Sequence, residues 1–478
     1  MSILGHLEPQ NVFKFFEEIC AIPHGSGNTK EISDYLVSFA KEKRLVHYQD
    51  KLGNVIIVKE ASNGYENSQS LIMQAHIDMV CEKEIDNTKD MSKEAVELVV
   101  NDDLISAKGT TLGADDGIGV AYILAVLNDD SLVHPKIEAI FTVDEEIGML
   151  GAFGIDVSKL TGKKMLNLDC GDEKIFTVSC AGGITLKSIF NFNREEYKGS
   201  TLNIKISGLS GGHSGVMIGK GGANSNNLSG RLLSMLLNEV DIRLCNIEGG
   251  FKDNAIPVET SITIVTTNPV KCADIISKAK CIFKSEYSVT DPELYVMYNE
   301  CEYCVPFDSE STKKAIYLLS IAPNGVQKMS SHINDLVETS LNFAILNCKN
   351  NNLEATFSVR SSTNSQKDMM IDKLKNLIES LGGTTEISGD YPGWEFKEES
   401  EFRNLVTKIY VDKFGFEPKM EAVHAGLECG LFSGMIKGLD ALSYGPDMWD
   451  VHTPLERLSI SSTARVWEFI KELLKNLK

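Results

Sequence analysis

Length, composition and charge limit the function before any motif is considered. The 478 residues exceed what one hydrophobic core usually organises, so two domains are expected. A net charge of −20 argues against nucleic acid or an anionic membrane as a partner, and 42% hydrophobic with 24% charged residues is ordinary for a soluble globular chain.

Membrane and export signals are not apparent. No apolar run approaches the roughly 18 residues that span a bilayer, and the N-terminal segment MSILGHLEPQNVFKFFEEIC predicts an amphipathic helix rather than a signal peptide. The eleven cysteines are odd in number and irregularly spaced, so a reduced cytoplasmic location is expected. Cys301 and Cys304 form the single Cys-x-x-Cys, for which incidental thiols are favoured over a zinc or redox motif.

The first part of the chain alternates predicted strands with predicted helices. Residues 28–45 carry Ile32, Leu36 and Phe39 at helical spacing, and a second, strongly apolar helix follows Gly113. The strand-like runs are NVIIV, SLIMQAHI, IEAIFTV and KMLNLD. This order predicts an α/β fold with a mostly parallel mixed sheet flanked by helices.

From about Ser188 the pattern changes to longer alternating runs, which favour antiparallel strands with one wet face. Two helical stretches are expected near 271–284 and 366–381, and the recurring strand–helix pattern is compatible with two similar halves. The α/β pattern returns near Thr385. We therefore predict a catalytic domain in two parts, 1–186 and 385–478, interrupted by an inserted α+β lid domain, 187–384.

Five potential metal ligands lie at the ends of these predicted elements: His76, Asp115, Glu146, Asp169 and His452. Functional groups of parallel α/β sheets gather at the carboxyl ends of strands. Two imidazoles and three carboxylates suit two divalent metals that share one bridging carboxylate, for which Asp115 is the best candidate. Such a site generates hydroxide at neutral pH and polarises a carbonyl, so the pattern predicts a metal-dependent hydrolase of small peptides.

Each of the five residues also has an ordinary explanation, such as a satisfied buried histidine, a helix cap, a solvated acidic turn or an exposed loop histidine. The set is more informative than any member, because five separate explanations would be needed at five positions where such a sheet places function. Asp78 lies two residues after His76, on the same face of an extended segment, and would orient that imidazole. Asp116 is expected to face away from Asp115 and to support it.

The acidic run at 144–146 allows a division of labour. Glu146 would bind metal, while Glu145 would take a proton from the attacking water and pass it to the leaving amine. In the insertion, a glycine-rich segment holds His213, and its spacing excludes a nucleotide-binding phosphate loop. This segment suits a lid whose histidine donates to a developing oxyanion. Asn254 and Arg360 would add an amide and a guanidinium that fits a terminal carboxylate, although Arg360 is equally compatible with a surface charge.

Several strings together resemble those of the di-zinc peptidases that include carnosinase, aminoacylase and glutamate carboxypeptidase, and among them the bacterial Xaa-His dipeptidases. The strings are LIMQAHIDMV, LGADDGIG, TVDEEIGMLGA, LNLDCGDE, SGLSGGHSG, DNAIP, HAGLECG and DVHTPLE, and they cover essentially the whole chain in order. The resemblance implies a catalytic domain with an inserted lid, two zinc ions (with manganese or cobalt as alternatives) and hydrolysis of unblocked dipeptides by a hydroxide that bridges the metals.

The resemblance also implies roles for single residues. His76 and Asp169 would hold one metal, Glu146 and His452 the other, and Asp115 would bridge them. Asp78 would support His76, Glu145 would be the general base, and His213, Asn254 and Arg360 would bind substrate. Glu428 would approach the substrate's amino group. Asp116 departs from the asparagine expected at its position, which adds a charge beside the bridge.

Other functions remain open at this point. An aminotripeptidase or an amide deacylase would use the same metal core, and a non-catalytic metal-binding protein would keep the ligands, although the additional acid at Glu145 argues against it. The expected partner is a dipeptide substrate, with no nucleic acid and no membrane. A homodimer fits a lid with an extended sheet edge, whereas a doubled lid would replace the second subunit.

Overall fold

The computed structural model describes residues 2–478, which form two compact units. One unit contains the residues up to Ser179 together with Phe396–Ala422 and Leu427–Lys478. The other unit contains Cys180–Glu395 and the short segment Val423–Gly426. The first unit is thus built from both ends of the chain. The domain limits expected from the sequence, 1–186, 187–384 and 385–478, stay a prediction about folding units.

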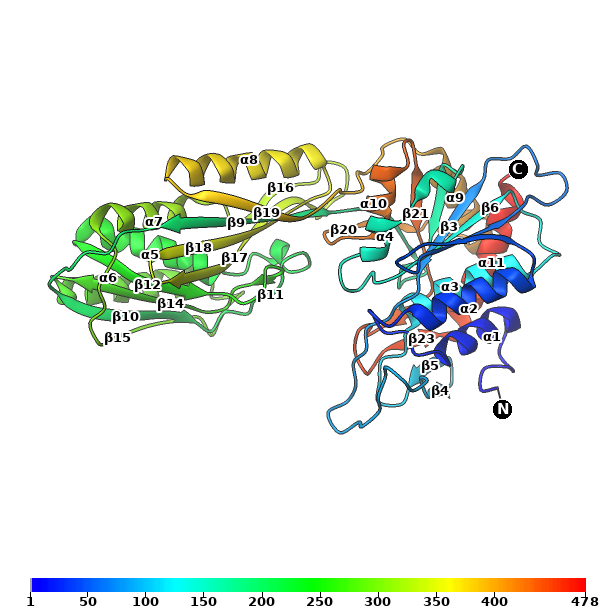
Figure 1. Ribbon diagram of the computed structural model, residues 1–478, viewed down its shortest axis with the longest axis horizontal. Coiled ribbons are helices and arrows are strands. Elements are labelled where there is room, and N and C mark those ends of the chain that lie inside the picture. Colours follow the sequence, from blue (N-terminus) through cyan, green and yellow to red (C-terminus); the bar gives the residue numbers. More distant parts are fainter. Residues whose placement is uncertain (1) are drawn as a thin grey trace. The chain divides into compact units, whose positions relative to one another are not determined.

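The first unit is organised around an eight-stranded mixed sheet (Figure 1). In spatial order its strands are β1 (Val46–Gln49), β2 (Val55–Lys59), β6 (Ile137–Thr142), β3 (Leu71–His76), β7 (Lys164–Asn167), β21 (Asp440–Ser443), β8 (Ile175–Cys180) and β20 (Lys419–Val423). The four central strands β6, β3, β7 and β21 are parallel, while β1, β2 and β8 pair antiparallel to their neighbours. The predicted α/β class with a mixed sheet is confirmed, and its parallel part lies at the centre.

Parallel pairing sets the strand ends beside one another. His76, the last residue of β3, pairs with Thr142, the last residue of β6. Gln74 of β3 pairs with Asn167, the last residue of β7. The segments that follow these strands therefore begin at one edge of the sheet, which is where a parallel sheet places its functional groups.

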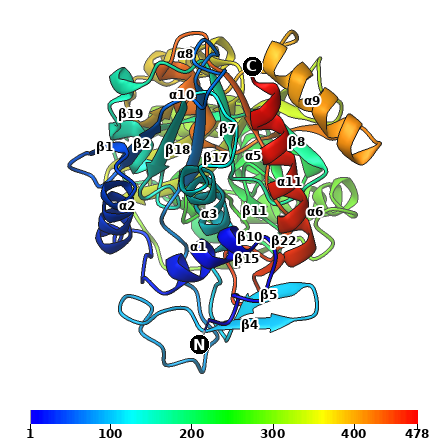
Figure 2. The ribbon, with the colours of Figure 1, turned by 90° about the vertical axis from the view of Figure 1, so that its right-hand side faces the viewer.

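Helices and a small second sheet complete the first unit (Figure 2). The helices are α1 (Gln10–Cys20), α2 (Lys30–Glu42), α3 (Ala114–Asn128), α4 (Leu150–Gly154), α9 (Glu401–Phe414), α10 (Glu428–Met435) and α11 (Ile460–Asn476), with a 3-10 turn at Val157–Lys159. The small sheet has the order β22 (Met448–Trp449), β23 (Arg457–Ser459), β5 (Leu104–Ala107) and β4 (Leu98–Asn101). Helix α3 packs on β3, α9 on β21, and α11 next to α9, as the red and orange helices of Figure 2 show.

The core of this unit follows from its apolar periodicity. Ile32, Leu36 and Phe39 of α2 are buried, as their spacing predicts. Helix α3 is apolar on all sides, and its residues Gly117–Leu127 are all buried, so it is an internal helix rather than a surface one. Phe176 of β8 and Phe469 of α11 pack with Tyr410 and Tyr444 in a cluster of aromatic rings.

The second unit contains a nine-stranded sheet whose neighbouring strands pair antiparallel. Its main order is β15 (Tyr295–Glu300), β10 (Ser200–Ser207), β14 (Thr260–Thr266), β12 (Ile242–Gly249), β17 (Val337–Lys349), β18 (Asn352–Ser361), β9 (Gly182–Asn191) and β19 (Thr384–Tyr391), with β16 (Gly325–Met329) also pairing with β17. Two four-stranded portions meet where Gly249 of β12 pairs with Leu346 of β17. The antiparallel insertion is as expected, and a similarity between its two portions stays a prediction.

Four helices pack in the second unit, where the sequence predicted two. They are α5 (Ser225–Glu239), α6 (Pro269–Glu286), α7 (Ser309–Ile321) and α8 (Asn364–Ser380). The expected stretches near 271–284 and 366–381 correspond to α6 and α8, and α5 and α7 are additional. A two-stranded ladder of β11 (Gly212–His213) and β13 (Ala255–Ile256) and a 3-10 turn at Ile218–Lys220 complete this unit. Among the described residues, none of the helices combines the length and the apolar character that a membrane span requires.

Candidate metal centre

Asp115 lies at the start of α3, where its carboxylate faces two imidazoles. Its Oδ1 is 3.1 Å from His76 Nε2, and its Oδ2 is 3.1 Å from His452 Nε2. The chain leaves helical geometry at Asp115 (φ −83°, ψ 105°) and at Asp116, which turns the Asp115 side chain towards the strand ends. One carboxylate therefore presents a different oxygen to each of two histidines.

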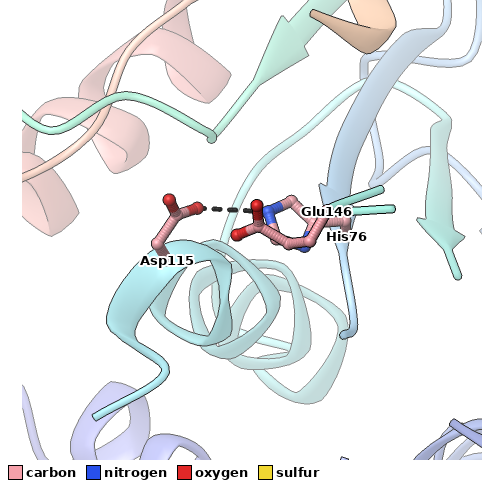
Figure 3. A group of neighbouring side chains, drawn as sticks. All are labelled: His76, Asp115 and Glu146. Atoms are coloured by element: carbon pink, nitrogen blue, oxygen red, sulfur yellow. Dashed lines mark hydrogen bonds and ion pairs between the residues drawn. The ribbon is translucent and has the colours of Figure 1, made fainter. Parts of the chain in front are cut away.

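Glu146 completes this cluster. Its Oε1 is 2.7 Å from His452 Nε2, and its side chain gathers with those of His76 and Asp115 (Figure 3). Within residues 2–478, this is the group of three acids and imidazoles whose ligand atoms all lie within 4.8 Å of one another. His452, at φ 63°, is held in the left-handed region that non-glycine residues seldom adopt and that often marks functional sites.

The charges of this cluster shift one another's pKa values. Burial lowers the pKa of His76, but the carboxylates of Asp115 and Asp78 outweigh it and raise that pKa well above its usual range. Hydrogen bonds that His452 donates to the carboxylates of Asp115 and Glu146 raise its pKa to about 10. Burial opposes the ionisation of Asp115, but the two histidines hold its pKa well below the usual range. The charged forms thus stabilise one another.

Asp169 follows β7 by two residues and belongs to the same charged environment. Burial, together with the negative charge of Asp115, raises the pKa of Asp169 to about 8. Burial also raises the pKa of Glu145 well above its usual range, with the charges of Asp169 and Glu428 acting in the same direction. Buried carboxyl groups resist ionisation when nearby negative charges are not balanced, and a bound cation would balance them. The raised pKa values of Asp169 and Glu145 therefore suit a cation site.

Asp78 organises this edge of the sheet. Its carboxylate lies 3.4 Å from His76 Nδ1 and accepts the Ser26 hydroxyl at 2.7 Å. The same carboxylate accepts the backbone N–H groups of Glu145 at 2.9 Å and Glu146 at 3.3 Å. The geometry expected from the sequence, with Asp78 supporting His76, is present, and Asp78 also fixes the acidic turn.

The donor set fits divalent metals. Imidazole nitrogens and carboxylate oxygens are the ligands that zinc prefers besides thiolates, and the same set suits manganese and cobalt. His76 Nδ1 is engaged with Asp78, so that Nε2 faces Asp115 and the rest of the cluster, which is how metal-binding histidines are usually oriented. Two bound cations would take the place of the protons on the histidines and on Asp169, and would neutralise the carboxylates of Asp115, Glu146 and Asp169.

The candidate substrate residues of the insertion lie in the second unit. His213 sits on β11, paired with Ala255 of β13, so that Asn254 directly precedes the strand opposite to it. Arg360 lies on β18, and its Nη1 donates to the hydroxyl of Tyr391 at 3.2 Å. The roles of these three residues in substrate binding stay predictions.

Comparison with known proteins assigns the chain to a family. Residues 72–476 match the family described as Peptidase family M20/M25/M40.

The chain belongs to this peptidase family.

It is 36% identical over 489 aligned positions to the cytosol non-specific dipeptidase of Escherichia coli (strain K12), covering 100% of this chain and 99% of the relative. The crystal structure of aminoacylhistidine dipeptidase from Vibrio alginolyticus superposes with a TM-score of 0.93 at 35% identity, over 99% and 98% of the two chains. Aminopeptidase PepT from Bacillus cereus shares the fold, with a TM-score of 0.58 and 15% identity over 98% and 99% of the chains.

Glu428 occupies a buried position in this M20 chain. It begins α10, and its Oε2 accepts the Gln74 amide at 2.5 Å and the Thr142 hydroxyl at 2.6 Å. Its other oxygen has no hydrogen-bond partner among the described residues. Burial raises the pKa of Glu428 to about 7. The contact with a substrate's amino group that the sequence predicts stays a prediction.

Asp116 contacts the backbone of His76. Its carboxylate is buried, and its Oδ2 accepts the backbone N–H of His76 at 3.3 Å. This hydrogen bond holds the end of β3, where His76 lies, against the start of α3. Burial and the charge of Asp169 raise the pKa of Asp116 well above its usual range.

Sequence reasoning missed several buried polar contacts in each of the two units. Asn167 donates to Gln74 at 2.6 Å, which extends the polar chain that begins at Glu428. His424, the first residue of the HAGLECG string, lies in the second unit, where its Nε2 is 2.7 Å from Ser340 Oγ. Burial and the charge of Arg360 lower the pKa of His424 to about 4, so its imidazole is neutral. Gln74, a polar residue inside an apolar strand, was the one sequence signal that a buried polar contact lies there.

Proposed function

We propose that this protein is a metal-dependent dipeptidase that hydrolyses unblocked dipeptides, with Xaa-His among them. Its family membership and the dipeptidase names of its full-length relatives support this activity. Two divalent metals would occupy the centre. His76 and Asp169 would hold one, Glu146 and His452 the other, and Asp115 both. Zinc is the expected metal, with manganese or cobalt as alternatives.

The observation that carries the proposal is the position of Asp115 between two histidines. Its Oδ1 faces His76 and its Oδ2 faces His452, and these histidines are 376 positions apart in the numbered sequence. A carboxylate that offers one oxygen to each of two ligand groups is suited to bridge two cations. If Asp115 were only a helix cap or one partner of a salt bridge, a second histidine and Glu146 would not be needed beside it.

The chain's own residues would position and move protons. Bound divalent metals supply Lewis acidity and lower the pKa of water. Glu145 accepts the proton of the attacking water and delivers it to the nitrogen of the leaving amine. Asp78 fixes the backbone N–H of Glu145, which holds this base next to the His76 side of the centre. The buried surroundings of Glu145 raise its pKa well above the usual range, which suits a group that takes up a proton and returns it.

Substrate selection would use the charged ends of a free dipeptide. Arg360 has a buried Nε without a hydrogen-bond partner among the described residues, and its planar fork suits a terminal carboxylate. Glu428 has one unpartnered buried oxygen, which suits an ammonium group. His213 would donate to the developing oxyanion, and Asn254 would bind the peptide backbone. A carboxylate clamp of this kind accepts two residues and excludes longer chains.

A substrate panel tests this function. The purified protein is assayed with Ala-His, β-Ala-His, Ala-Ala, the tripeptide Ala-Ala-His, N-acetyl-Ala-His and N-acetyl-alanine, before and after chelation. Turnover of the free dipeptides alone, lost on chelation and regained with Zn²⁺, Mn²⁺ or Co²⁺, is the expected result. Equal rates with the tripeptide would instead identify an aminotripeptidase, and cleavage of N-acetyl-alanine an amide deacylase. Metal binding without any turnover would identify a non-catalytic protein.

The cellular setting is also part of the proposal. A cytoplasmic location is supported by the name of the Escherichia coli relative, which refers to the cytosol. No nucleic acid or membrane partner is proposed. A homodimer stays a prediction, which light scattering of the purified protein tests directly.

A further inference from the structure

Glu456 binds the backbone that carries Asp115. Its side chain is 2% exposed, and each of its oxygens accepts two backbone N–H groups. Oε2 accepts Leu112 at 2.7 Å and Gly113 at 3.0 Å, while Oε1 accepts Ala114 at 2.8 Å and Asp115 at 3.3 Å. One carboxylate therefore satisfies four consecutive amides at the start of α3.

These amides have no local partner. The N-cap of α3 is Gly113, which has no side chain, and φ 74° at this residue places it in the left-handed region. The first N–H groups of a helix need acceptors from outside the helix, and negative charge is favourable there. Glu456, 343 residues further along the chain than Gly113, takes the place of a local cap. A buried carboxylate with four N–H donors is fully satisfied, and such charge-assisted bonds are strong.

The loop that contributes Glu456 also contributes His452. This loop lies between β22 and β23, and it is braced internally. The hydroxyl of Thr453 donates to the carbonyl of Asp450 at 2.7 Å, and the backbone N–H of Glu456 donates to the carbonyl of Thr453 at 3.1 Å. Arg457 and Asp450 form an ion pair at 2.5 Å. His452 and Glu456 are therefore held in one short, tied segment.

We propose that Glu456 is the positioning residue that sets the separation of Asp115 and His452, and thereby the metal affinity of the centre. This inference rests on the proposed function, because it concerns the same metal centre. The Glu456 carboxylate grips the Asp115 backbone from the His452 loop, so the two ligands, 3.1 Å apart, move together. The backbone N–H groups of Leu112, Gly113 and Ala114 are bound to this loop through Glu456. Loss of the Glu456 carboxylate would therefore release the start of α3 from the loop.

Glu456→Gln tests the proposal with little change in volume. The amide oxygen can still accept one pair of N–H groups, but the amide NH2 then faces the other pair, donor against donor. Removing a residue that orients metal ligands typically weakens metal binding or activity about 10- to 100-fold. We therefore expect Zn²⁺ binding to the chelated variant, measured by calorimetric titration, to be at least tenfold weaker at one site. The kcat for Ala-His is expected to fall while KM changes little, because both oxygens of Glu456 are occupied by backbone N–H groups.

Glu138→Gln is the matched control. Glu138 is also fully buried and accepts backbone N–H groups, from Thr161 at 2.9 Å and Gly162 at 2.9 Å. It lies near the beginning of β6, at the opposite end of that strand from Thr142 and the metal centre. This variant is expected to lose thermal stability like Glu456→Gln, and to keep the Zn²⁺ affinity and KM of the wild type. The comparison separates positioning from a general loss of stability.

The outcomes decide the proposal as follows. Weaker Zn²⁺ binding in Glu456→Gln supports it, provided that this variant has a native circular dichroism spectrum and that Glu138→Gln keeps the Zn²⁺ affinity of the wild type. Zn²⁺ affinity and kcat within twofold of the wild type overturn it. If Glu456→Gln does not fold, Glu456→Asp is measured by the same criteria, because its shorter carboxylate keeps the charge but cannot reach all four amides. A wild-type protein that binds Zn²⁺ but cleaves no dipeptide refutes the proposed function, while the Zn²⁺ titrations still decide the role of Glu456.

Discussion

The carboxylate of Asp78 accepts the backbone N–H of Glu145 at 2.9 Å. The same carboxylate lies 3.4 Å from the ring of His76, so it connects a proposed metal ligand with the proposed general base. These two segments follow neighbouring parallel strands, β3 and β6, whose last residues are paired. The strand pairing brings them near each other, and Asp78 sets their relative position.

Asp78→Asn is expected to weaken both functions of this link. The amide keeps one acceptor oxygen, but it loses the charge that favours the metal-binding tautomer of His76. Zn²⁺ affinity is expected to fall about 10- to 100-fold, with a parallel loss of kcat. Asp440→Asn is the control, because Asp440 likewise accepts a backbone N–H, from Phe402 at 3.2 Å, and lies at the beginning of β21, the end of the parallel sheet away from the metal centre. Equal Zn²⁺ affinities in Asp78→Asn and the wild type would contradict this role.

Glu145→Gln separates catalysis from metal binding. If Glu145 transfers the proton, kcat is expected to fall about 10²- to 10⁴-fold, while the bound metal measured by mass spectrometry stays at the wild-type amount. Glu146→Gln provides the contrast, because Glu146 contacts His452 at 2.7 Å and its loss is expected to reduce the metal content as well. Near-normal turnover in Glu145→Gln would show that another group is the base.

The metal-free protein is expected to lose stability as the pH rises. The folded pKa of His452 is about 10 against an ordinary 6.5, so the protonated imidazole stabilises the fold at low pH and this contribution is lost as the pH rises towards 10. The pKa of Asp169 is about 8 against 3.8, so the folded state also holds this proton longer than the unfolded state does. The deprotonation of either group therefore lowers the free energy of unfolding as the pH rises.

The corresponding measurement compares the midpoints of thermal unfolding of the chelated and metal-loaded proteins between pH 6.5 and about 10, the ordinary and the folded pKa of His452. The midpoint of the chelated protein is expected to fall as the pH rises, and that of the metal-loaded protein to change less, because the ligands are already deprotonated. Zn²⁺ affinity is expected to rise with pH, with protons released on binding. A chelated protein whose midpoint rises over the same range would refute the pKa assignment.

Gly151→Ala is expected to disturb the turn that carries Glu145 and Glu146. A Cβ at this position would lie 2.3 Å from the carbonyl oxygen of Val143 and 2.4 Å from Asn54 Oδ1. Overpacking of this kind costs about 1–3 kcal/mol in the free energy of unfolding, and a fall in kcat is expected with it. Gly171→Ala is the control, since its nearest neighbours are 3.8 Å away. Equal melting temperatures and activities of the two variants would contradict the expectation.

The sequence was sufficient to predict the site's location because short apolar runs end directly before it. His76 ends β3, and Glu146 and Asp169 follow β6 and β7 within four residues. In a parallel sheet these ends meet whatever the loops do. The missed helices had local signals as well. Asp308 caps α7 by accepting the N–H of Ser311, and Asn224 caps α5 in the same way, but glycines before and inside α5 obscured its periodicity.

Partners distant in the sequence could not be predicted. Glu456 is an ordinary acid in a polar loop, and only the fold brings it to the amides of residues 112–115. Glu428 finds Gln74 and Thr142 on two other strands for the same reason. Local patterns report which side chains end an element, whereas the partner of a buried charge depends on the packing of segments hundreds of residues apart.

Titration of the chelated protein with Zn²⁺, with dipeptide turnover followed at each addition, tests the central claim most directly. If residues from both ends of the chain converge on two cations, binding saturates at two Zn²⁺ per chain, and Ala-His hydrolysis is regained over the same additions. Full activity without metal, or a protein that binds no Zn²⁺ and stays inactive, would contradict the account.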